Sequence, residues 1–517
     1  MIKLISAAPA VSSPIDPLPM WLLKECADVV APFITDLFNL SMSSGVVPAT
    51  FKTAIVTPIL KKTGLDESDP RNYRPISNLA TLGKLLERVV AGQLTSYLNL
   101  NKLFPELQSA YRQHRSTENA LVKVVNDIIL AIDSGDIALL SLLDLSSAFD
   151  TVDHDILLER LKLSFGVQST PLSWIKSYLS ERSYTVSFCG AMSQVDTVYC
   201  GVPQGSVLGP LLFILYTADI EKIIQSFGLS VHLYADDTQQ YCSSRPVDAA
   251  TLKRKTAESV QQVAQWMASN RLQLNAGKTE CMWCATTRRQ LILDCCPIDL
   301  GGSTVTPSVM VRDLGVLLSS DMSMTGHVGK VVGECYYKLR QLKTCRLCIP
   351  VSVALSLVNS FVVSKIDYCN ALLADQPDYV LCRFQSVLNT AARLVFGLKK
   401  FDHISDIMRD KLHWLRARER VEFKLCLLVF KAMHGLAPEY ITSMCLPVSS
   451  VESRRRLRSA TAGDLVVPAT TTKFGQRAFS VAAIKAWNCL PISIRLSCSV
   501  EAFKKALKTH LFIKSYN

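Results

Sequence analysis

The chain has 517 residues, 49% hydrophobic and 19% charged, which fits a globular protein of about three structural units. No uninterrupted apolar run reaches the roughly 18 residues of a membrane span, and the N-terminus carries no convincing signal peptide. We therefore expect an intracellular protein that contacts no membrane. Its 17 cysteines are scattered and odd in number, which predicts reduced thiols rather than a disulfide framework.

The formal net charge of +12 is unevenly distributed along the chain. Residues 321–517 carry 29 basic and 14 acidic side chains, a net +15, whereas the first 320 residues sum to −3. A basic C-terminal portion fits contacts with phosphates, although a solvated basic surface gives the same count.

Helices and strands alternate in the first part of the sequence, and helices dominate the second part. The hydrophobic spacing predicts helices over 21–40, 81–100 and 117–133, with Ser116 and Thr117 available as N-caps. Strands are expected over 51–62 and 136–145, and the second is apolar enough to be buried on both faces. From about residue 326 onward helical segments prevail, including 329–345 and 380–397.

Three aspartates stand at the ends of predicted strands. Asp144 ends the buried strand, and Asp236 with Asp237 separates VHLY from TQQY, which are typical hairpin arms. If these strands are neighbours, three carboxylates converge, and such a cluster is stable mainly with bound cations. Hard oxygen ligands favour magnesium, and two such ions support phosphoryl transfer. An acidic pair is also an ordinary turn signal, so the dipeptide alone does not decide between these interpretations.

Two further segments carry chemistry. The segment GVPQGSVLGPLLF (201–213) surrounds Gln204 with glycines and prolines, which lets a backbone approach a flat substrate closely. The segment NRLQLNAGKTECMW (270–283) places Lys278 on a loop before a strand.

Taken in order, LLDLSSAFDTVDH, GVPQGSVLGPLLFILY, YADDTQQY and NAGKTE resemble the reverse transcriptases of non-LTR retrotransposons of the LINE type. NYRPISNLATLGKLLERV and QSAYRQHRSTENAL precede these motifs, VRDLGVLL follows them, and later segments such as AFSVAAIKAWNCLPISIR extend the resemblance over nearly the whole chain. It implies an RNA-directed DNA polymerase that uses an RNA template, a DNA primer and deoxynucleoside triphosphates.

The implied fold is α+β, a right-hand polymerase with fingers, palm and thumb and a mostly helical C-terminal extension. The boundaries we expect are 1–45 for an N-terminal extension, 46–320 for fingers and palm, 321–400 for a thumb and 401–517 for a basic C-terminal region.

The resemblance also implies roles for single residues. Asp144 and Asp236 match the ligands of two Mg²⁺ ions, Asp237 is the second carboxylate of the pair, and the carbonyl of Leu145 matches a further ligand.

Phe149 matches an aromatic residue under the sugar that rejects a 2′-hydroxyl, although packing in the core would also explain a phenylalanine there. Gln204 matches a residue that lies against the templating base pair. Lys278 matches a cation near the β-phosphate, with a solvated lysine as the alternative.

Two cations match the fingertip residues that hold the incoming triphosphate. One is Arg74, whose planar guanidinium suits phosphate oxygens. The other is one of Lys61 or Lys62, and we favour Lys62.

Members of this group carry an N-terminal endonuclease, which we expect this sequence to lack because only about forty residues precede the fingers. A catalytically inactive remnant that only binds nucleic acid is the alternative function. The intact aspartates favour an enzyme, and the C-terminal segments argue against an intron-encoded or telomere-maintaining relative.

Two cysteine pairs and a basic cluster are further candidate sites. Cys281 with Cys284 and Cys345 with Cys348 lack suitably spaced partners, so no zinc site is expected. The basic cluster 453–459 fits a nuclear-entry signal, a phosphate contact or a solvated loop. Because the basic excess is C-terminal, we expect residues beyond about 400 to supply much of the nucleic-acid affinity, and residues 1–400 to retain DNA synthesis.

Overall fold

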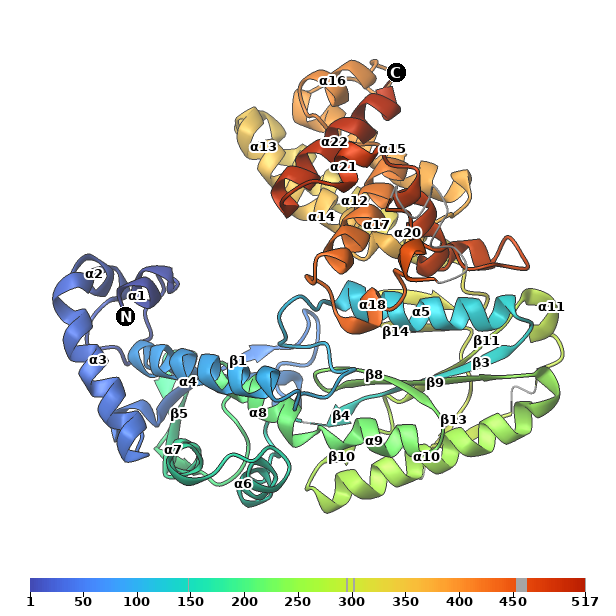
Figure 1. The fold of residues 1–517 in the computed structure, drawn as a ribbon. Coiled ribbons are helices and arrows are strands. Elements are labelled where there is room, and N and C mark those ends of the chain that lie inside the picture. Colours follow the sequence, from blue (N-terminus) through green and yellow to red (C-terminus); the bar gives the residue numbers. More distant parts are fainter. Residues whose placement is uncertain (147, 294–295, 301–302, 452–462, 517) are drawn as a thin grey trace. The chain divides into compact units, whose positions relative to one another are not determined.

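The computed structural model describes residues 1–146, 148–293, 296–300, 303–451 and 463–516 (Figure 1). These residues form two units, each built from three chain segments. Unit 1 comprises 1–111, 144–226 and 259–276, and unit 2 comprises 112–143, 227–258 and 277–517. The sequence instead predicts four contiguous regions, and their boundaries at 45, 320 and 400 stay predictions.

Three helices open unit 1, namely α1 (Ile2–Ala7), α2 (Met20–Glu25) and α3 (Ala27–Ser44). The sequence predicts one helix over 21–40, whereas the structure breaks it at Cys26, which lies between α2 and α3 with ψ of 17°. α3 packs against α7 through a buried face that includes Ile34 and Phe38.

The main sheet of unit 1 is centred on β1. β1 pairs antiparallel with β2 and parallel with β5, and β5 pairs in turn with β6 and β7. The bounds are Thr53–Leu60 for β1, Tyr73–Leu79 for β2, Arg182–Phe188 for β5, Ala191–Met192 for β6 and Asp196–Val198 for β7. The observed β1 confirms the strand predicted over 51–62.

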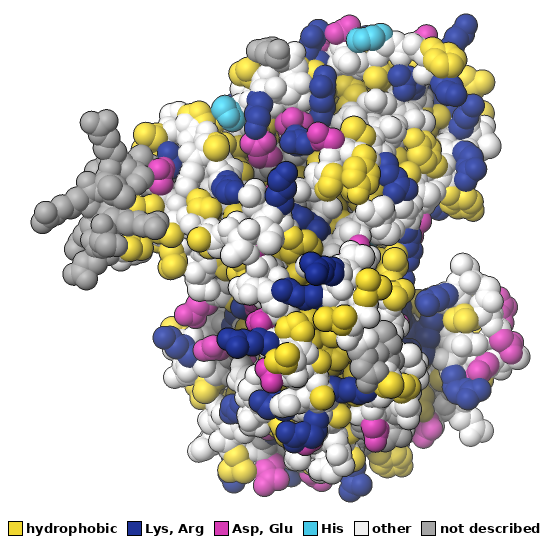
Figure 2. All heavy atoms as spheres, turned by 90° about the vertical axis from the view of Figure 1, so that its right-hand side faces the viewer, with side chains coloured by type: hydrophobic (Ala, Val, Ile, Leu, Met, Phe, Trp, Pro, Cys, Tyr) yellow, Lys and Arg dark blue, Asp and Glu magenta, His cyan; other side chains and the backbone are white. Residues whose placement is uncertain are grey.

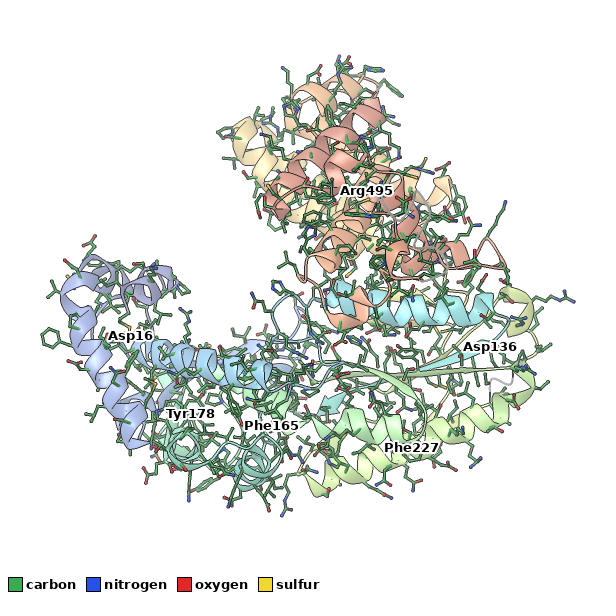
Figure 3. The ribbon with its side chains drawn as sticks, viewed as in Figure 1. Asp16, Asp136, Phe165, Tyr178, Phe227 and Arg495 are labelled. Atoms are coloured by element: carbon green, nitrogen blue, oxygen red, sulfur yellow. The ribbon has the colours of Figure 1, made fainter. Side chains whose placement is uncertain are left out.

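Helices complete the core of unit 1. They are α4 (Thr81–Leu100), α6 (His154–Leu163), α7 (Ser169–Leu179), α8 (Leu208–Tyr216) and α9 (Asp219–Ser226). α4 has the predicted bounds because its apolar positions recur at helical spacing, and the Asp16 carboxylate accepts from the backbone N–H of its first residue, Thr81. α8 is almost entirely buried between α4 and α6, and Tyr178 on α7 is also buried (Figure 3).

Unit 2 contains a four-stranded antiparallel sheet in the order β11-β3-β9-β8. The bounds are Ile137–Leu143 for β3, Ser230–Tyr234 for β8, Asp237–Ser244 for β9 and Glu280–Cys284 for β11. β3 lies inside the sheet and six of its seven residues are buried, which confirms the predicted buried strand. α5 (Thr117–Asp133) packs on β3, β8 and β9, and the Ser116 hydroxyl caps it by accepting from the N–H of Asn119 (Figure 1).

One long helix, a short helix and two small hairpins accompany this sheet along the chain. α10 (Ala249–Ser269) follows β9 and contributes its first half to unit 2 and its second half to unit 1. Unit 2 also contains α11 (Thr287–Gln290) and two small hairpins, β12 (Ile298–Leu300) with β13 (Ser303–Val305) and β14 (Met310–Asp313) with β15 (Val316–Ser319).

After β15 the chain is helical, which confirms the predicted helical C-terminal region. The α-helices are α12 (Thr325–Cys345), α13 (Val351–Val358), α14 (Ser364–Asp367), α15 (Asp378–Phe396), α16 (Ser405–Asp410), α17 (Ala417–Met433), α18 (Glu439–Thr442), α20 (Phe479–Asn488), α21 (Ile492–Arg495) and α22 (Val500–Tyr516). Dark blue Lys and Arg side chains are spread over these helices in the upper part of Figure 2.

The helices beyond residue 400 belong to the core of unit 2. α17 packs against α15, α20 and α22, and Phe430 stacks on Phe503 with ring centroids 4.1 Å apart. Lys424 on α17 also pairs with Glu118 on α5 at 3.0 Å. The expectation that residues 1–400 retain synthesis stays a prediction, and this packing argues against it, because a chain ending there would expose the core of unit 2. The basic cluster 453–459 lies outside the described residues.

Candidate functional site

The aspartate pair lies in the tight turn of a hairpin in unit 2. Tyr234 of β8 pairs with Asp237 of β9, which leaves Ala235 and Asp236 as the two turn residues. Ala235 has a φ of 56°, a left-handed conformation of the kind that two-residue turns use. Both aspartates are half-buried, and the predicted hairpin is confirmed.

A buried carboxyl group lies near Asp237. Gln239, two residues along β9 and on the same face, donates from Nε2 to Oδ1 of Asp313 at 2.7 Å. Burial raises the pKa of Asp313 to about 7; the hydrogen bond from Gln239 opposes this rise, and the negative charge of Asp237 adds to it. Gln239 Oε1 and Asp313 Oδ2 are buried without a hydrogen-bond partner among the described residues. The buried Asp313 beside Asp237 therefore favours its protonated, neutral form.

Asp144 directly follows β3 along the chain. Leu143, the last residue of β3, pairs with Thr238, the residue after Asp237. Asp144 itself is grouped with unit 1, where its backbone carbonyl accepts from the N–H of Asn275 at 2.8 Å and its Oδ2 accepts from Asn275 Nδ2 at 3.2 Å.

The next residue, Leu145, is buried in the short strand β4 (Leu145–Ser146). β4 pairs antiparallel with β10 (Gln273–Leu274). This pairing and the two bonds from Asn275 hold the backbone on both sides of Asp144 in one conformation.

A cavity of about 730 Å³ lies in unit 1 between β1, β2, β5 and the segment 198–204. Its lining is mostly apolar, with a few polar groups. Among the lining residues are Tyr73, Pro75, Ser77, Asp150, Arg182 and Gln204.

Gln204 is held inside this cavity through both its side chain and its backbone. Its Nε2 donates to both carboxylate oxygens of Asp150 at 2.9 Å, and its carbonyl accepts from the N–H of Ser77 at 2.7 Å. Burial raises the pKa of Asp150, while the hydrogen bond from Gln204 and the charge of Lys61 act against the rise.

Gly205 explains part of the glycine-rich sequence. Its φ is 120°, and a Cβ there would lie 2.6 Å from the carbonyl oxygen of Ser77. A side chain is thus excluded by both conformation and space. The close approach here is to the backbone of β2, whereas the approach to a flat substrate that the sequence indicates stays a prediction.

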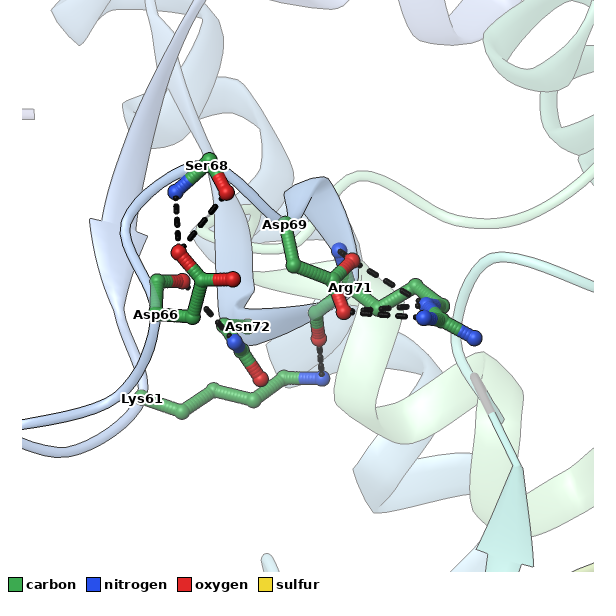
Figure 4. Close-up of polar contacts among 6 residues, drawn as sticks. All are labelled: Lys61, Asp66, Ser68, Asp69, Arg71 and Asn72. Carbon is green, nitrogen blue, oxygen red and sulfur yellow. Dashed lines mark hydrogen bonds and ion pairs between the residues drawn. The ribbon is translucent and has the colours of Figure 1, made fainter.

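Lys61 and Lys62 lie on the connection between β1 and β2, of which Figure 4 shows Lys61, whereas Arg74 is the second residue of β2. Lys61 Nζ donates to the carbonyl of Arg71 at 2.7 Å, and Asp69 binds the Arg71 guanidinium at 3.0 Å. Lys62 and Arg74 are both exposed. The charge of Lys61 acts to lower the pKa of Asp150, which lines the cavity, so Lys61 is the lysine with an electrostatic link to the cavity. The sequence favours Lys62 instead.

Phe149 is half-buried in unit 1 and stacks on Phe213 of α8, with ring centroids 4.6 Å apart at an angle of 29°. This contact supports the packing alternative and leaves the predicted contact with a sugar untested. Lys278 is exposed in unit 2, two residues before β11.

The cysteine pairs occupy different surroundings. Cys281 and Cys284 are buried in β11, where burial raises the pKa of Cys281 to about 11 and that of Cys284 to about 12. Cys345 is half-buried and Cys348 is exposed. Within the described ranges, no group of three or more His, Cys, Asp or Glu side chains is arranged to hold a metal ion.

Sequence reasoning missed three carboxyl groups near these segments. Glu87 caps α8 by accepting from the N–H groups of Val207 and Leu208 at 2.6 and 3.0 Å. Asp150 holds Gln204, and Asp313 bonds to Gln239. All three lie within motifs that carry the resemblance: Asp150 in LLDLSSAFDTVDH, Glu87 in NYRPISNLATLGKLLERV and Asp313 in VRDLGVLL.

Comparison with known proteins defines the class of this site. Residues 59–315 match the family described as Reverse transcriptase (RNA-dependent DNA polymerase). This segment is a reverse transcriptase domain related to those of non-LTR retrotransposons. The suspected resemblance is thereby confirmed.

Two similar proteins come from mobile elements of Drosophila melanogaster. The RNA-directed DNA polymerase from mobile element jockey is 30% identical over 310 residues, covering 59% of this chain and 33% of that protein. The probable RNA-directed DNA polymerase from transposon X-element is 29% identical over 387 residues, covering 73% and 41%. The chain thus matches well under half the length of these relatives.

Among solved structures, apo telomerase from Candida tropicalis aligns with 71% of this chain and 62% of its own, at 13% identity and a TM-score of 0.40. In the part of the chain that the structure describes, every helix is too short or too polar to cross a membrane.

Proposed function

We propose that the chain is an RNA-directed DNA polymerase, which extends a primer 3′-hydroxyl with deoxynucleotides on an RNA template. The placement of the aspartates carries the proposal. Asp144 directly follows Leu143, whose partner in register is Thr238, and Asp237 directly precedes Thr238. Such a placement suits carboxylates that act together in phosphoryl transfer. The family match over 59–315 supports it.

Two Mg²⁺ ions are the proposed cofactor, held by Asp144 and Asp236 with Asp237 and the carbonyl of Leu145 as further donors. The donor chemistry fits, because magnesium prefers carboxylate and carbonyl oxygens. The hydrogen bond from Asn275 to Asp144 and the pairing of Leu145 in β4 support the fit, since they hold two of these donors in place. When bound, the ions would lower the pKa of the primer hydroxyl and stabilise the charge of the leaving pyrophosphate.

The protein's own side chains orient the substrates in this proposal. The Phe149 ring excludes a 2′-hydroxyl, and Gln204, held by Asp150, presents a fixed surface to the templating pair. A preorganised group of this kind loses little entropy when the substrate binds.

Cations hold the triphosphate. Arg74 and Lys62 are free to reach it as exposed side chains, with Lys61 as the alternative lysine. Lys278 would donate a proton to the pyrophosphate as it leaves.

Primer extension on a homopolymer RNA template with magnesium tests the proposal. We expect the wild-type chain to extend the primer and Asp236→Ala to fail, while both retain template binding. The second candidate function, an inactive remnant that only binds nucleic acid, predicts binding without extension by the wild-type chain. That result would exclude the proposed polymerase activity.

A further inference from the structure

A second cavity lies in unit 2 at the far end of the sheet from the aspartate turn. Its volume is about 510 Å³, within the range of roughly 300–1,000 Å³ common for ligand pockets. Gly135 lines the cavity and lies two residues before Ile137, where β3 begins. β3 ends at Leu143, which directly precedes Asp144. Seven strand residues separate the two places, about 23 Å at 3.3 Å per residue.

The walls of this cavity come from three distant stretches of sequence. They are the end of α5 with Asp133, the segment around α11 with Arg288 and Arg289, and the loop before α20 with Thr472 and Phe474. Figure 1 shows α11 at the end of the sheet, and Figure 2, which faces this side, shows Lys and Arg beside hydrophobic side chains.

Asp133 fixes the loop that carries Phe474. Its carboxylate accepts from the backbone N–H groups of Thr471 and Thr472 at 2.8 and 2.9 Å, and from the Thr472 hydroxyl at 2.6 Å. Its carbonyl also accepts from the Thr471 hydroxyl at 2.5 Å. A Cβ on Gly475 would lie 2.4 Å from Asp133 Cγ, so the loop can pack this closely only with glycine there. The cavity is therefore formed before any ligand arrives.

Two guanidinium groups line this cavity without an internal partner. Arg288 is exposed and Arg289 is half-buried, and neither guanidinium has an ion pair or hydrogen bond with any described residue. Arg289 Nη2 lies 3.3 Å from where a Cβ on Gly135 would be, so the glycine leaves room for it.

The acidic group in the lining offsets only one of these positive charges. Burial acts to raise the pKa of Asp133, but the hydrogen bonds from Thr472 and Thr471 outweigh it and lower the pKa. The Asp133 carboxylate is thus ionised and held by the threonines, and the exposed Lys473 adds a further cation to the same loop, so the positive charge remains in excess.

Phe474 adds a flat apolar surface to the basic wall. It lines the cavity, and the Arg477 guanidinium stacks on its ring, 5.1 Å from the centroid. Arg477 also donates to the carbonyl of Met322, so the ring is backed by a fixed side chain. Phe474 is half-buried, and paired arginines beside an aromatic ring that lines a cavity are groups that bind phosphate and stack a base in single-stranded nucleic acid.

We propose that this cavity binds one nucleotide of a single-stranded nucleic acid, with its phosphate on Arg288 and Arg289 and its base against Phe474. The site would hold a strand away from the aspartates, as a second anchor. The inference rests on the proposed function only in that the chain binds nucleic acid.

Fluorescence anisotropy of the full chain with short labelled oligouridylate and oligothymidylate, over a range of salt concentrations, tests the proposal. R288Q/R289Q should weaken binding and flatten the dependence of log affinity on log salt by about 0.7 for each phosphate that is no longer neutralised. F474L should weaken binding roughly fivefold or more and leave the salt slope unchanged, because stacking carries no charge. If the pocket variants lose affinity for oligouridylate alone, the cavity binds RNA. If they lose affinity for oligothymidylate alone, it binds DNA.

R254Q/K255Q is the matched control, since it removes two exposed cations from α10 in the same unit. Pocket variants that lose no more affinity than this control overturn the site. A wild-type chain that binds neither oligonucleotide overturns the proposed function as well, whereas wild-type binding with unaffected pocket variants overturns the pocket alone.

Photo-crosslinking of the wild-type chain gives a readout that does not depend on variant folding. An oligouridylate containing 4-thiouridine, or an oligothymidylate containing 5-bromodeoxyuridine, should crosslink to the peptide that contains Phe474. Crosslinks that never include this peptide would contradict the site.

Discussion

Phe149 has a packing role in the structure and a proposed role in sugar selection, and one substitution separates them. Phe149→Val removes the stack on Phe213 and should lower the free energy of unfolding by roughly 1–3 kcal/mol. It should also raise the incorporation of ribonucleotides relative to deoxynucleotides, because the ring under C2′ is gone. Primer extension with each nucleotide class measures the ratio. An unchanged ratio in a less stable protein would assign Phe149 to packing alone.

Asp313 should make stability depend on pH. Its pKa of about 7 in the folded chain lies above the ordinary value of 3.8, so the folded state keeps a proton that the unfolded chain releases. The stability this contributes is complete below about pH 4 and is lost as pH rises to about 7, by at most about 1.4 kcal/mol per pH unit.

Asp313→Asn isolates this contribution, since the amide cannot ionise and can still pair with Gln239. Buried His232, whose pKa burial lowers to about 3, acts in the opposite direction over part of the range, so wild type and variant are compared at each pH. Urea unfolding should show the variant gaining stability relative to wild type between pH 4 and 7. A constant difference would mean that Asp313 is ionised throughout.

At the scale of elements, the loop 201–206 depends on a close approach between backbones. Gly205→Ala would place a Cβ 2.6 Å from the Ser77 carbonyl and shift the loop that carries Gln204. We expect lower thermal stability and a loss of primer extension. Gly190→Ala is the control, because Gly190 also has a positive φ but has no atom within 4 Å of the added Cβ. Equal effects of the two substitutions would show that the close approach is unimportant.

Elements with a local signal could be predicted from the sequence. α4 and α5 have the predicted bounds because their apolar spacing and the Ser116 cap are contained within each helix. The hairpin around Asp236 was predicted because its arms adjoin the turn.

Contacts between distant segments could not be predicted. Asp133 and Thr471 are 338 positions apart, and nothing in either segment indicates the other. The partnership of Gln239 with Asp313, and the cavity with Arg288 and Phe474, depend on such long-range packing. The break at Cys26 has no Pro or Gly at that position, and the sequence carries no signal for it.

At the scale of the whole molecule, the basic C-terminal region must be tested with substitutions, because its helices complete the core of unit 2. Lys505 and Lys508 are exposed on α22, which also buries Phe503 and Leu507. K505Q/K508Q should flatten the salt dependence of template binding by about 0.7–0.9 for each phosphate that these lysines neutralise, without changing thermal stability. An unchanged slope would mean that these lysines face solvent when nucleic acid is bound.

The central claim is that Asp144 and Asp236 act together in phosphoryl transfer. The most direct measurement is magnesium-dependent primer extension, with template binding measured in parallel, for Asp144→Asn and Asp236→Asn. Each variant loses a ligand charge worth several kcal/mol in the transition state, so extension should be abolished while binding stays nearly unchanged. Extension at about a tenth of the wild-type rate or more in either variant would contradict the assignment.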